Sequence, residues 1–271
     1  IIEQFNELEV NLDFLQSNND SSTRVVNVDR DQFGDRFFSG FEPSLHSCFA
    51  DEALSMKLIE KELQKLDKCF LRTKYLVTGT NVLSSSISAE TIFFLLEQAK
   101  KSEVKVVIDL NWREVFWDYS NFASDTSKKG RINLIKNFLN HAHVIKLAKE
   151  EATLFFEIEN PSLISQQMSK RPDVIITDGK NPVSWHINGF QGNTKIPKSQ
   201  KIVDTTGAGD AFLAGLISEF ISFGYPKSEL EIQACVRFAS ACGLLTCHGE
   251  GAIEPQPDYE KVSKFLGSLI S

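Results

Sequence analysis

The sequence is poor in the features that mark membrane proteins, nucleic-acid-binding proteins and P-loop enzymes. No apolar run in its 271 residues reaches the roughly 18 that a membrane span requires. The 36 acidic residues outnumber the 29 basic ones, the net charge is -7, and no long basic block occurs. We therefore expect neither a nucleic acid nor a membrane as a partner. The GxxxxGK[ST] motif is also missing, which excludes a P-loop enzyme.

Cysteine is scarce and unpaired. The sequence has five cysteines and no Cys-x-x-Cys pair: Cys48, Cys69, Cys235, Cys242 and Cys247. An odd number without paired spacing is typical of a reducing, intracellular compartment. Cys242 and Cys247 stand five residues apart without a second ligand pair, so we predict no zinc site there.

From residue 74 onward, short apolar runs alternate with amphipathic stretches. The runs predict buried strands at 74–80, 104–111, 143–148 and 173–179, and the stretches predict helices at 89–102, 129–142 and 149–158. Strands that alternate with helices of this length are typical of a parallel sheet covered on both faces. The fold class is therefore predicted to be α/β.

The first third of the chain predicts smaller elements. Residues 1–15 predict a short helix that runs into a strand, and residues 51–66 predict a helix. Two β-rich runs within 22–42 flank a turn-forming segment, "DRDQFGD", which predicts a hairpin. No repeat, low-complexity tract or linker interrupts the chain, so we expect a single domain over 1–271 with the hairpin as an appendage.

The stretch "VDTTGAGDAFLAGLISEF", Val203–Phe220, joins a glycine-rich turn to a helical pattern. The apolar residues after Asp210 follow helical spacing, which places Gly207, Ala208 and Gly209 at a helix N-terminus. The first amides of a helix have no intrahelical partner and the dipole favours negative charge, so small residues there allow an anion to approach. A phosphate would repel the Asp210 carboxylate, so Asp210 is predicted to take the proton from a hydroxyl that attacks phosphorus.

Taken alone, Gly-x-Gly-Asp is equally compatible with a tight turn and an acidic residue that favours the helix dipole. The longer string Asp204–Asp210, "DTTGAGD", resembles the second signature of the PfkB (ribokinase-like) carbohydrate kinases. The segments "IDLNWREVFW", "VIKLAKEEATLF", "IITDGKNPV" and "RFASACGLLTCHGEGAIEP" resemble segments of plant fructokinase-like members, in order along the chain. The hairpin near Gly34 resembles the lid of that family.

This resemblance implies a ribokinase-like three-layer α/β/α sandwich with a mostly parallel central sheet and a small β lid. It implies transfer of the γ-phosphoryl group of ATP to a hydroxymethyl group of a fructose-like sugar or sugar acid, with Mg²⁺ and K⁺. The implied catalytic residues are the base Asp210 and the anion-hole residues Gly207, Ala208 and Gly209. A homodimer through the lid is also implied, as is a location in the cytoplasm or the plastid stroma.

The resemblance further implies binding residues along the chain. It assigns nucleotide binding to Thr177, Gly179, Gly207 and Ser240. It assigns substrate binding to Asp210, Asn111 and Arg113. It assigns metal binding to Glu151 for Mg²⁺ and to Asp204 and Thr206 for K⁺. Each also has a plainer interpretation. Glu151 suits a helix cap, Thr177 a strand end, and Asn111 and Arg113 an exposed loop.

The sequence departs from the family pattern at several places. Ala148 stands where a small polar residue is usual, Ser240 stands in the place of an asparagine, and "FEPS" at 41–44 lacks the arginine of the lid. The N-terminal sugar-binding segment of the family is not found, so we expect its strands to be missing. Two alternatives remain, a non-catalytic fructokinase-like scaffold and a nucleoside-type kinase. Asp210 favours a kinase over the scaffold, and the Asp-x-Asn-x-Arg segment favours a sugar.

Overall fold

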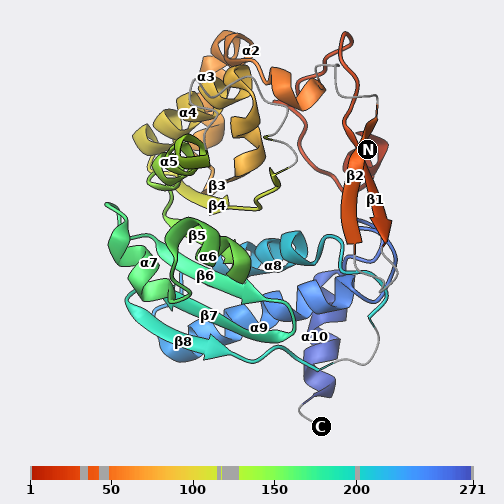
Figure 1. Ribbon diagram of the computed structural model, residues 1–271, viewed down its shortest axis with the longest axis vertical. Helices are drawn as coiled ribbons and strands as arrows, with labels where there is room; N and C mark the ends of the chain where they lie inside the picture. Colours follow the sequence, from red (N-terminus) through yellow and green to blue (C-terminus); the bar gives the residue numbers. More distant parts are fainter. Residues whose placement is uncertain are drawn as a thin grey trace. The chain divides into compact units, whose positions relative to one another are not determined.

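The computed structural model describes residues 2–30, 36–42, 49–114, 117, 128–198 and 202–269 (Figure 1). These residues form two compact units that interleave along the sequence. The first comprises Ile1–Thr73, Thr80–Val104 and Trp112–Ile135, and the second comprises Lys74–Gly79, Lys105–Asn111 and Lys136–Ser271. Each unit is described by itself below.

The first unit is built from short helices and one hairpin. Its elements are α1 (Ile2–Glu7), β1 (Val25–Arg30), β2 (Arg36–Glu42), the 3-10 helices η1 (Ala50–Ala53) and η2 (Thr80–Ser84), and the helices α2 (Met56–Lys61), α3 (Leu63–Phe70) and α4 (Ser86–Lys101). Strands β1 and β2 pair antiparallel as a two-stranded sheet and coincide with the predicted hairpin. The central residues of its turn, the lid residues Pro43 and Ser44, and Cys48 lie outside the described residues.

Two predictions for this unit are wrong. Residues 8–22 form turns and irregular structure in place of the strand predicted after α1. Leu8 is 68% exposed and Val10 46% exposed, so their apolar side chains have no core to alternate against. The helix predicted at 51–66 is divided into η1, α2 and α3, because Glu62 leaves the helical conformation with φ −110° and ψ 23°.

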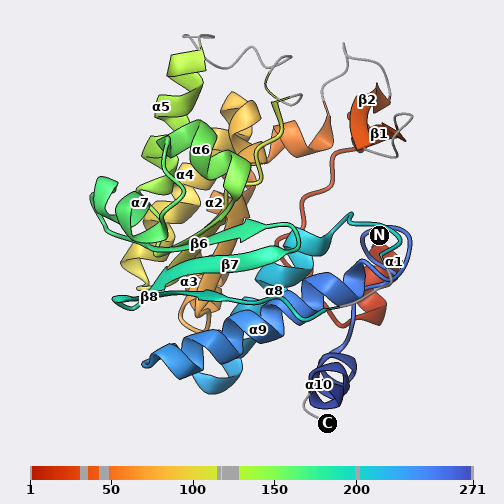
Figure 2. The same cartoon turned by 60° about the horizontal axis from the view of Figure 1, so that its bottom comes forward.

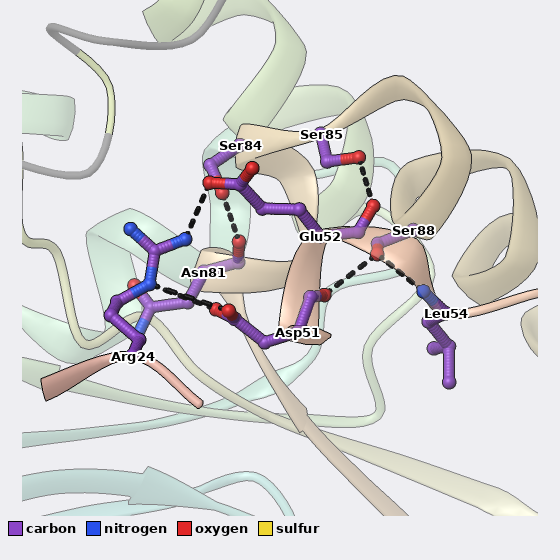
Figure 3. Close-up of polar contacts among 8 residues, drawn as sticks. All are labelled: Arg24, Asp51, Glu52, Leu54, Asn81, Ser84, Ser85 and Ser88. Atoms are coloured by element: carbon purple, nitrogen blue, oxygen red, sulfur yellow. Dashed lines mark hydrogen bonds and ion pairs between the residues drawn. The ribbon is translucent and has the colours of Figure 1, made fainter. Parts of the chain in front are cut away.

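A polar network fastens η1 within the first unit (Figure 3). The Arg24 guanidinium contacts Asp51 at 3.1 Å and Glu52 at 2.6 Å, and it lies 4.2 Å from the centre of the Phe49 ring. The Ser88 hydroxyl at the start of α4 donates to the Asp51 carbonyl at 2.8 Å and accepts from the Leu54 amide at 3.1 Å. The half-buried arginine thus has acceptors for its donors and a ring for its flat face.

The second unit contains a six-stranded sheet. Its strands are β3 (Tyr75–Gly79), β4 (Lys105–Asp109), β5 (Val144–Ala148), β6 (Asp173–Asp178), β7 (Asn181–Ile187) and β8 (Phe190–Thr194), and they lie in sequence order. β3 to β6 are parallel, whereas β7 and β8 join antiparallel at one edge. The four predicted strands and the α/β fold class are confirmed, and the antiparallel pair is an addition.

The helices of the second unit cover both faces of this sheet (Figure 2). They are α6 (Lys149–Phe156), α7 (Pro161–Gln167), α8 (Ala208–Phe223), α9 (Glu229–Thr246) and α10 (Tyr259–Ser268), while α5 (Lys128–Leu139) spans the sequence boundary between the units. Helices α6 and α7 lie on one face, and α8 and α9 lie on the other. Between the sheet and α8 and α9, apolar side chains such as Trp185, Leu216 and Val236 are fully buried. Burial of each such side chain contributes about 1.5–3 kcal/mol of stability.

None of the described helices combines the length and the apolar character that a membrane span requires.

Candidate functional site

The glycine-rich segment forms the N-terminus of α8, as predicted. Gly207 precedes the helix with φ 77°, a left-handed conformation that favours glycine, and a Cβ there would lie 3.0 Å from Ala252. The cap residue has no side chain that could accept from the first amides of the helix. The Ala208 amide donates to the Thr205 carbonyl at 3.3 Å, and no side chain caps the start of the helix, where the positive end of its dipole lies. These are the features that bind an anion.

Asp210 occupies the first turn of α8 and its side chain is exposed. Among the described residues, its carboxylate forms no hydrogen bond or ion pair with another side chain. An exposed, unengaged carboxylate beside an anion-binding helix start is available to accept a proton from a bound hydroxyl.

A buried ion pair lies next to the same turn. Asp109 ends β4, Lys146 lies opposite it on β5, and the Lys146 Nζ is 3.0 Å from the Asp109 Oδ2. The two residues are only 6% and 7% exposed. A Cβ at Gly209 would lie 2.9 Å from the Lys146 Nζ, so glycine at this position leaves room for the ammonium group against α8. Sequence reasoning assigned no role to Lys146, although the family-like segment "VIKLAKEEATLF" contains it and a lysine inside an apolar run was a visible signal.

Glu151 caps α6. Its Oε2 accepts from the Ala148 amide at 2.6 Å, and the residue is 8% exposed. The structure therefore shows Glu151 as a helix cap, which is the plainer of its two interpretations. The proposed role toward Mg²⁺ concerns the same carboxylate and stays a prediction.

Besides Gly207 at the start of α8, the predicted nucleotide-binding residues lie at two places. Thr177 and Gly179 stand at the end of β6, where the Thr177 hydroxyl donates to the Leu147 carbonyl at 3.3 Å and Gly179 has φ 52°. Ser240 is buried within α9, and its hydroxyl donates to the Val236 carbonyl at 2.7 Å. The hydroxyl of Ser240 is thus engaged by the backbone of its own helix.

The two oxygens of Asp204 join the loop before α8 to the loop after α9. Oδ1 accepts from the Thr206 amide at 2.6 Å, and Oδ2 accepts from the Gly251 amide at 3.1 Å. The Val203 amide donates to the Cys247 carbonyl at 2.8 Å, which adds a backbone link. A carboxylate oxygen that accepts one hydrogen bond can still offer a lone pair to a cation.

The described part of the chain contains no group of three or more His, Cys, Asp or Glu residues that could hold a metal ion by themselves. Cys247 is buried and its thiol donates to the Gly243 carbonyl at 3.2 Å. Burial, with Asp204 nearby, raises the pKa of this thiol, which disfavours the thiolate that a metal would need.

The two remaining sugar-binding candidates fall in different units. Asn111 follows β4 in the second unit, with φ 40°. Arg113 belongs to the first unit, where its Nη1 donates to the Trp112 carbonyl at 3.0 Å. Asn111 and Glu151 follow the carboxyl ends of β4 and β5, and Thr177 is the penultimate residue of the neighbouring strand β6. Ligands of open α/β sheets bind at this edge.

Comparisons with known proteins identify the family of this chain. The family model described as pfkB family carbohydrate kinase matches residues 1–259. The probable chloroplastic fructokinase-6 of Arabidopsis thaliana is 27% identical over 263 residues, which are 95% of this chain and 63% of that relative. This chain spans 64% and 63% of the lengths of the first two curated relatives.

Two solved structures share the fold. A fructokinase from Xylella fastidiosa with bound ATP has a TM-score of 0.82 and 23% identity, over 99% of this chain and 81% of that one. A double mutant of the Vibrio cholerae O395 fructokinase, with fructose, ADP and a potassium ion, has a TM-score of 0.76 and 23% identity, over 98% of this chain and 79% of that one.

Proposed function

Because the chain belongs to the pfkB family of carbohydrate kinases, we propose that it is an ATP-dependent sugar kinase. It transfers the γ-phosphoryl group of ATP to a hydroxymethyl group of a fructose-like sugar or sugar acid. The observation that carries this proposal is the start of α8, where uncapped amides and the exposed Asp210 lie within one helical turn. Relatives described as fructokinases support the choice of substrate class.

In the proposed reaction, Asp210 takes the proton of the sugar hydroxyl as its oxygen attacks the γ-phosphorus. A bond forms between that oxygen and phosphorus, and the bond to the β–γ bridging oxygen breaks, which releases ADP. The amides of Gly207, Ala208 and Gly209 stabilise the charge on the transferred group. Phosphoryl transfer depends mainly on positioning and charge stabilisation, and a helix N-terminus with preset dipoles provides both.

The nucleotide is proposed to bind along the carboxyl end of β6 through Thr177 and Gly179, next to the turn at Gly207, with Ser240 on the opposite helix. When bound, Mg²⁺ would neutralise charge on the phosphate oxygens. Mg²⁺ usually keeps several waters and needs only one or two carboxylates besides the phosphates, so the absence of a multi-ligand cluster among the described residues fits it. Glu151 would hold this ion through water.

Asp204 and Thr206 are proposed to bind K⁺. The loop that carries them is fixed to the Gly251 loop through the Asp204 carboxylate, so it offers oxygens in a set arrangement. The potassium ion in the Vibrio relative supports a monovalent cation in this family. We expect K⁺ to raise turnover above that in Na⁺ at equal ionic strength. Equal rates in the two salts would remove the cation from the proposal.

Asn111 and Arg113 are proposed to contact the sugar. The loop between them begins with a strained, left-handed asparagine, a conformation found often at functional sites.

The chloroplastic relative supports a plastid location. We also propose pairing of two copies through the β1–β2 hairpin, because a two-stranded sheet is marginally stable by itself. Analytical ultracentrifugation tests the pairing, and a monomer at all concentrations would refute it.

The test of the function is ADP release by the full-length gene product with MgATP. The acceptors are fructose, ribose, 2-keto-3-deoxygluconate, xylulose and adenosine, and the Asp210→Asn variant controls for contaminating kinases. Sugar-dependent ADP release that the variant lacks is expected. Release with adenosine alone would favour a nucleoside kinase. A folded protein that binds ATP and releases no ADP with any acceptor would favour the scaffold.

A further inference from the structure

Lys146 places a buried positive charge against the positive end of a helix. Its ammonium group lies close enough to Gly209 that a Cβ there would be 2.9 Å away, and Gly209 belongs to the first turn of α8. Cations normally stabilise helix C-termini and anions stabilise N-termini. The position of this lysine is therefore electrostatically unfavourable by itself.

Lys74 shows the ordinary arrangement on the same helix. Its Nζ donates to the Ile221 carbonyl at 3.3 Å, in the last turn of α8, where the dipole favours a cation. Lys74 is exposed, so its ammonium group also stays hydrated. Lys146 differs in both respects, because it is buried and lies at the opposite end.

The charge balance around Lys146 changes during the proposed reaction. Within the described part of the chain, the ion pair of Lys146 is with Asp109, at 3.0 Å. The Asp210 carboxylate in the first turn of α8 offsets the partial positive charge of the helix N-terminus, about half an elementary charge. A buried pair usually costs as much in lost hydration as it returns in attraction. When Asp210 takes the proton of the sugar hydroxyl, this offset is lost, and positive charge remains beside the turn that the proposed function assigns to a phosphoryl group.

We propose that Lys146 is a further functional residue of this reaction, and this proposal rests on the proposed function. Its ammonium group supplies positive charge to the phosphoryl group at the α8 N-terminus, from the side of the sheet. Asp109 is the positioning residue that holds the ammonium group under Gly209. Lys146 exchanges no proton, and it stabilises the charge on the phosphoryl oxygens as the bond to ADP breaks.

The competing explanation is that the pair only fills the space between β4, β5 and α8. Replacement of both partners separates the two explanations. Lys146→Met alone removes the ammonium group from beside the buried Asp109 carboxylate, and we expect a loss in Tm of about 10 °C. The double variant Asp109→Leu with Lys146→Met replaces the pair by apolar side chains of similar size. Such replacements are often neutral or stabilising, so its Tm is expected to return to that of the wild type.

Turnover is expected to behave differently from stability. Both the single and the double variant should lose about 10²- to 10³-fold in kcat, the scale for removal of one preset charge-stabilising group, with a smaller change in the KM for ATP. Tyr225→Phe is the matched control, since it breaks a buried hydrogen bond to Asp173 within the same unit. It should lower Tm without lowering kcat of the folded protein.

Inorganic phosphate provides a readout that does not depend on the sugar. Phosphate at matched ionic strength should raise the Tm of the wild type and of Tyr225→Phe, but not that of the double variant. If no acceptor supports turnover in the wild type, the kinase proposal fails, and this phosphate titration alone decides the role of Lys146. A double variant that regains both Tm and wild-type kcat, or that binds phosphate as the wild type does, would overturn the proposal.

Discussion

The polar groups near the two ends of α8 differ in how far they satisfy one another. Beyond the C-terminal end, Tyr225 donates to the Asp173 Oδ2, the Asn188 amide donates to the Oδ1 of the same carboxylate at 2.9 Å, and the Lys105 ammonium lies 3.9 Å from the centre of the Tyr225 ring. At the N-terminal end, Lys146 and Asp109 contact each other beside amides that lack a cap.

This difference separates stability from function within one unit. The groups at the C-terminal end satisfy one another, so they need no ligand to complete them. The first amides at the N-terminal end have no side-chain cap, and an incoming anion would satisfy them. Variants at the C-terminal end should therefore change unfolding, and variants at the N-terminal end should change turnover.

The largest effect is expected from Asp210→Asn. The amide keeps the size of the side chain but cannot take the proton of the sugar hydroxyl, so turnover should fall at least about a hundredfold. Folding and ATP affinity should be nearly unchanged, because the side chain is exposed at the start of α8. Steady-state kinetics and titration calorimetry with ATP measure the two quantities. Wild-type turnover in this variant would remove Asp210 from the mechanism.

Gly209→Ala should have the next largest effect. The new Cβ would lie 2.9 Å from the Lys146 Nζ, so the ammonium group must move away from its present position. We expect kcat to fall about tenfold, because even small misplacement of a charge-stabilising group is costly.

Gly215→Ala is the matched control on the same helix. A Cβ there would lie 2.6 Å from the Cys242 Sγ, in the contact between α8 and α9. It should destabilise the protein by about 1–3 kcal/mol while the folded enzyme keeps its kcat. Equal loss of kcat in the two glycine variants would contradict the separation of roles.

Asp173 should give a smaller, pH-dependent effect on stability. Burial raises the pKa of this carboxyl above the ordinary value of 3.8, against the opposing hydrogen bond from Tyr225. The folded state therefore binds the proton more readily than the unfolded state. Relative to Asp173→Asn, the unfolding free energy of the wild type should rise as the pH falls from neutral through the raised pKa. Urea unfolding of both proteins across this range measures the difference, and a difference that stays flat would refute the shifted pKa.

Much of the second unit was predictable from sequence, because buried parallel strands read as short apolar runs. The runs "KYLVTGT", "VKVVIDLN", "HVIKLA" and "DVIITDG" each match a parallel strand. The β7–β8 hairpin was missed although its signal was present. Val183, Trp185 and Ile187 alternate, and Asn188 and Gly189 both have positive φ, as a tight two-residue hairpin turn requires.

The site was predictable only in part. The α8 turn follows from local chemistry, since small residues and an acid precede an amphipathic pattern. The pairing of Asp109 with Lys146 depends on the register between β4 and β5, which joins residues 37 positions apart. No local pattern encodes such a register. The division of residues 51–66 was also hidden. Ser88, far along the chain, bonds the backbone at the end of η1, and Glu62 leaves the helical conformation between α2 and α3.

The most direct test of the account compares the same substitution at the two ends of α8. Lys74→Met and Lys146→Met each remove one ammonium group next to this helix, and turnover is measured per folded molecule with MgATP and the accepted sugar. Lys74→Met should cost about 0.3–1 kcal/mol of stability and leave turnover within about twofold of the wild type. Lys146→Met should lower turnover about a hundredfold or more. Similar turnover in the two variants would contradict the account.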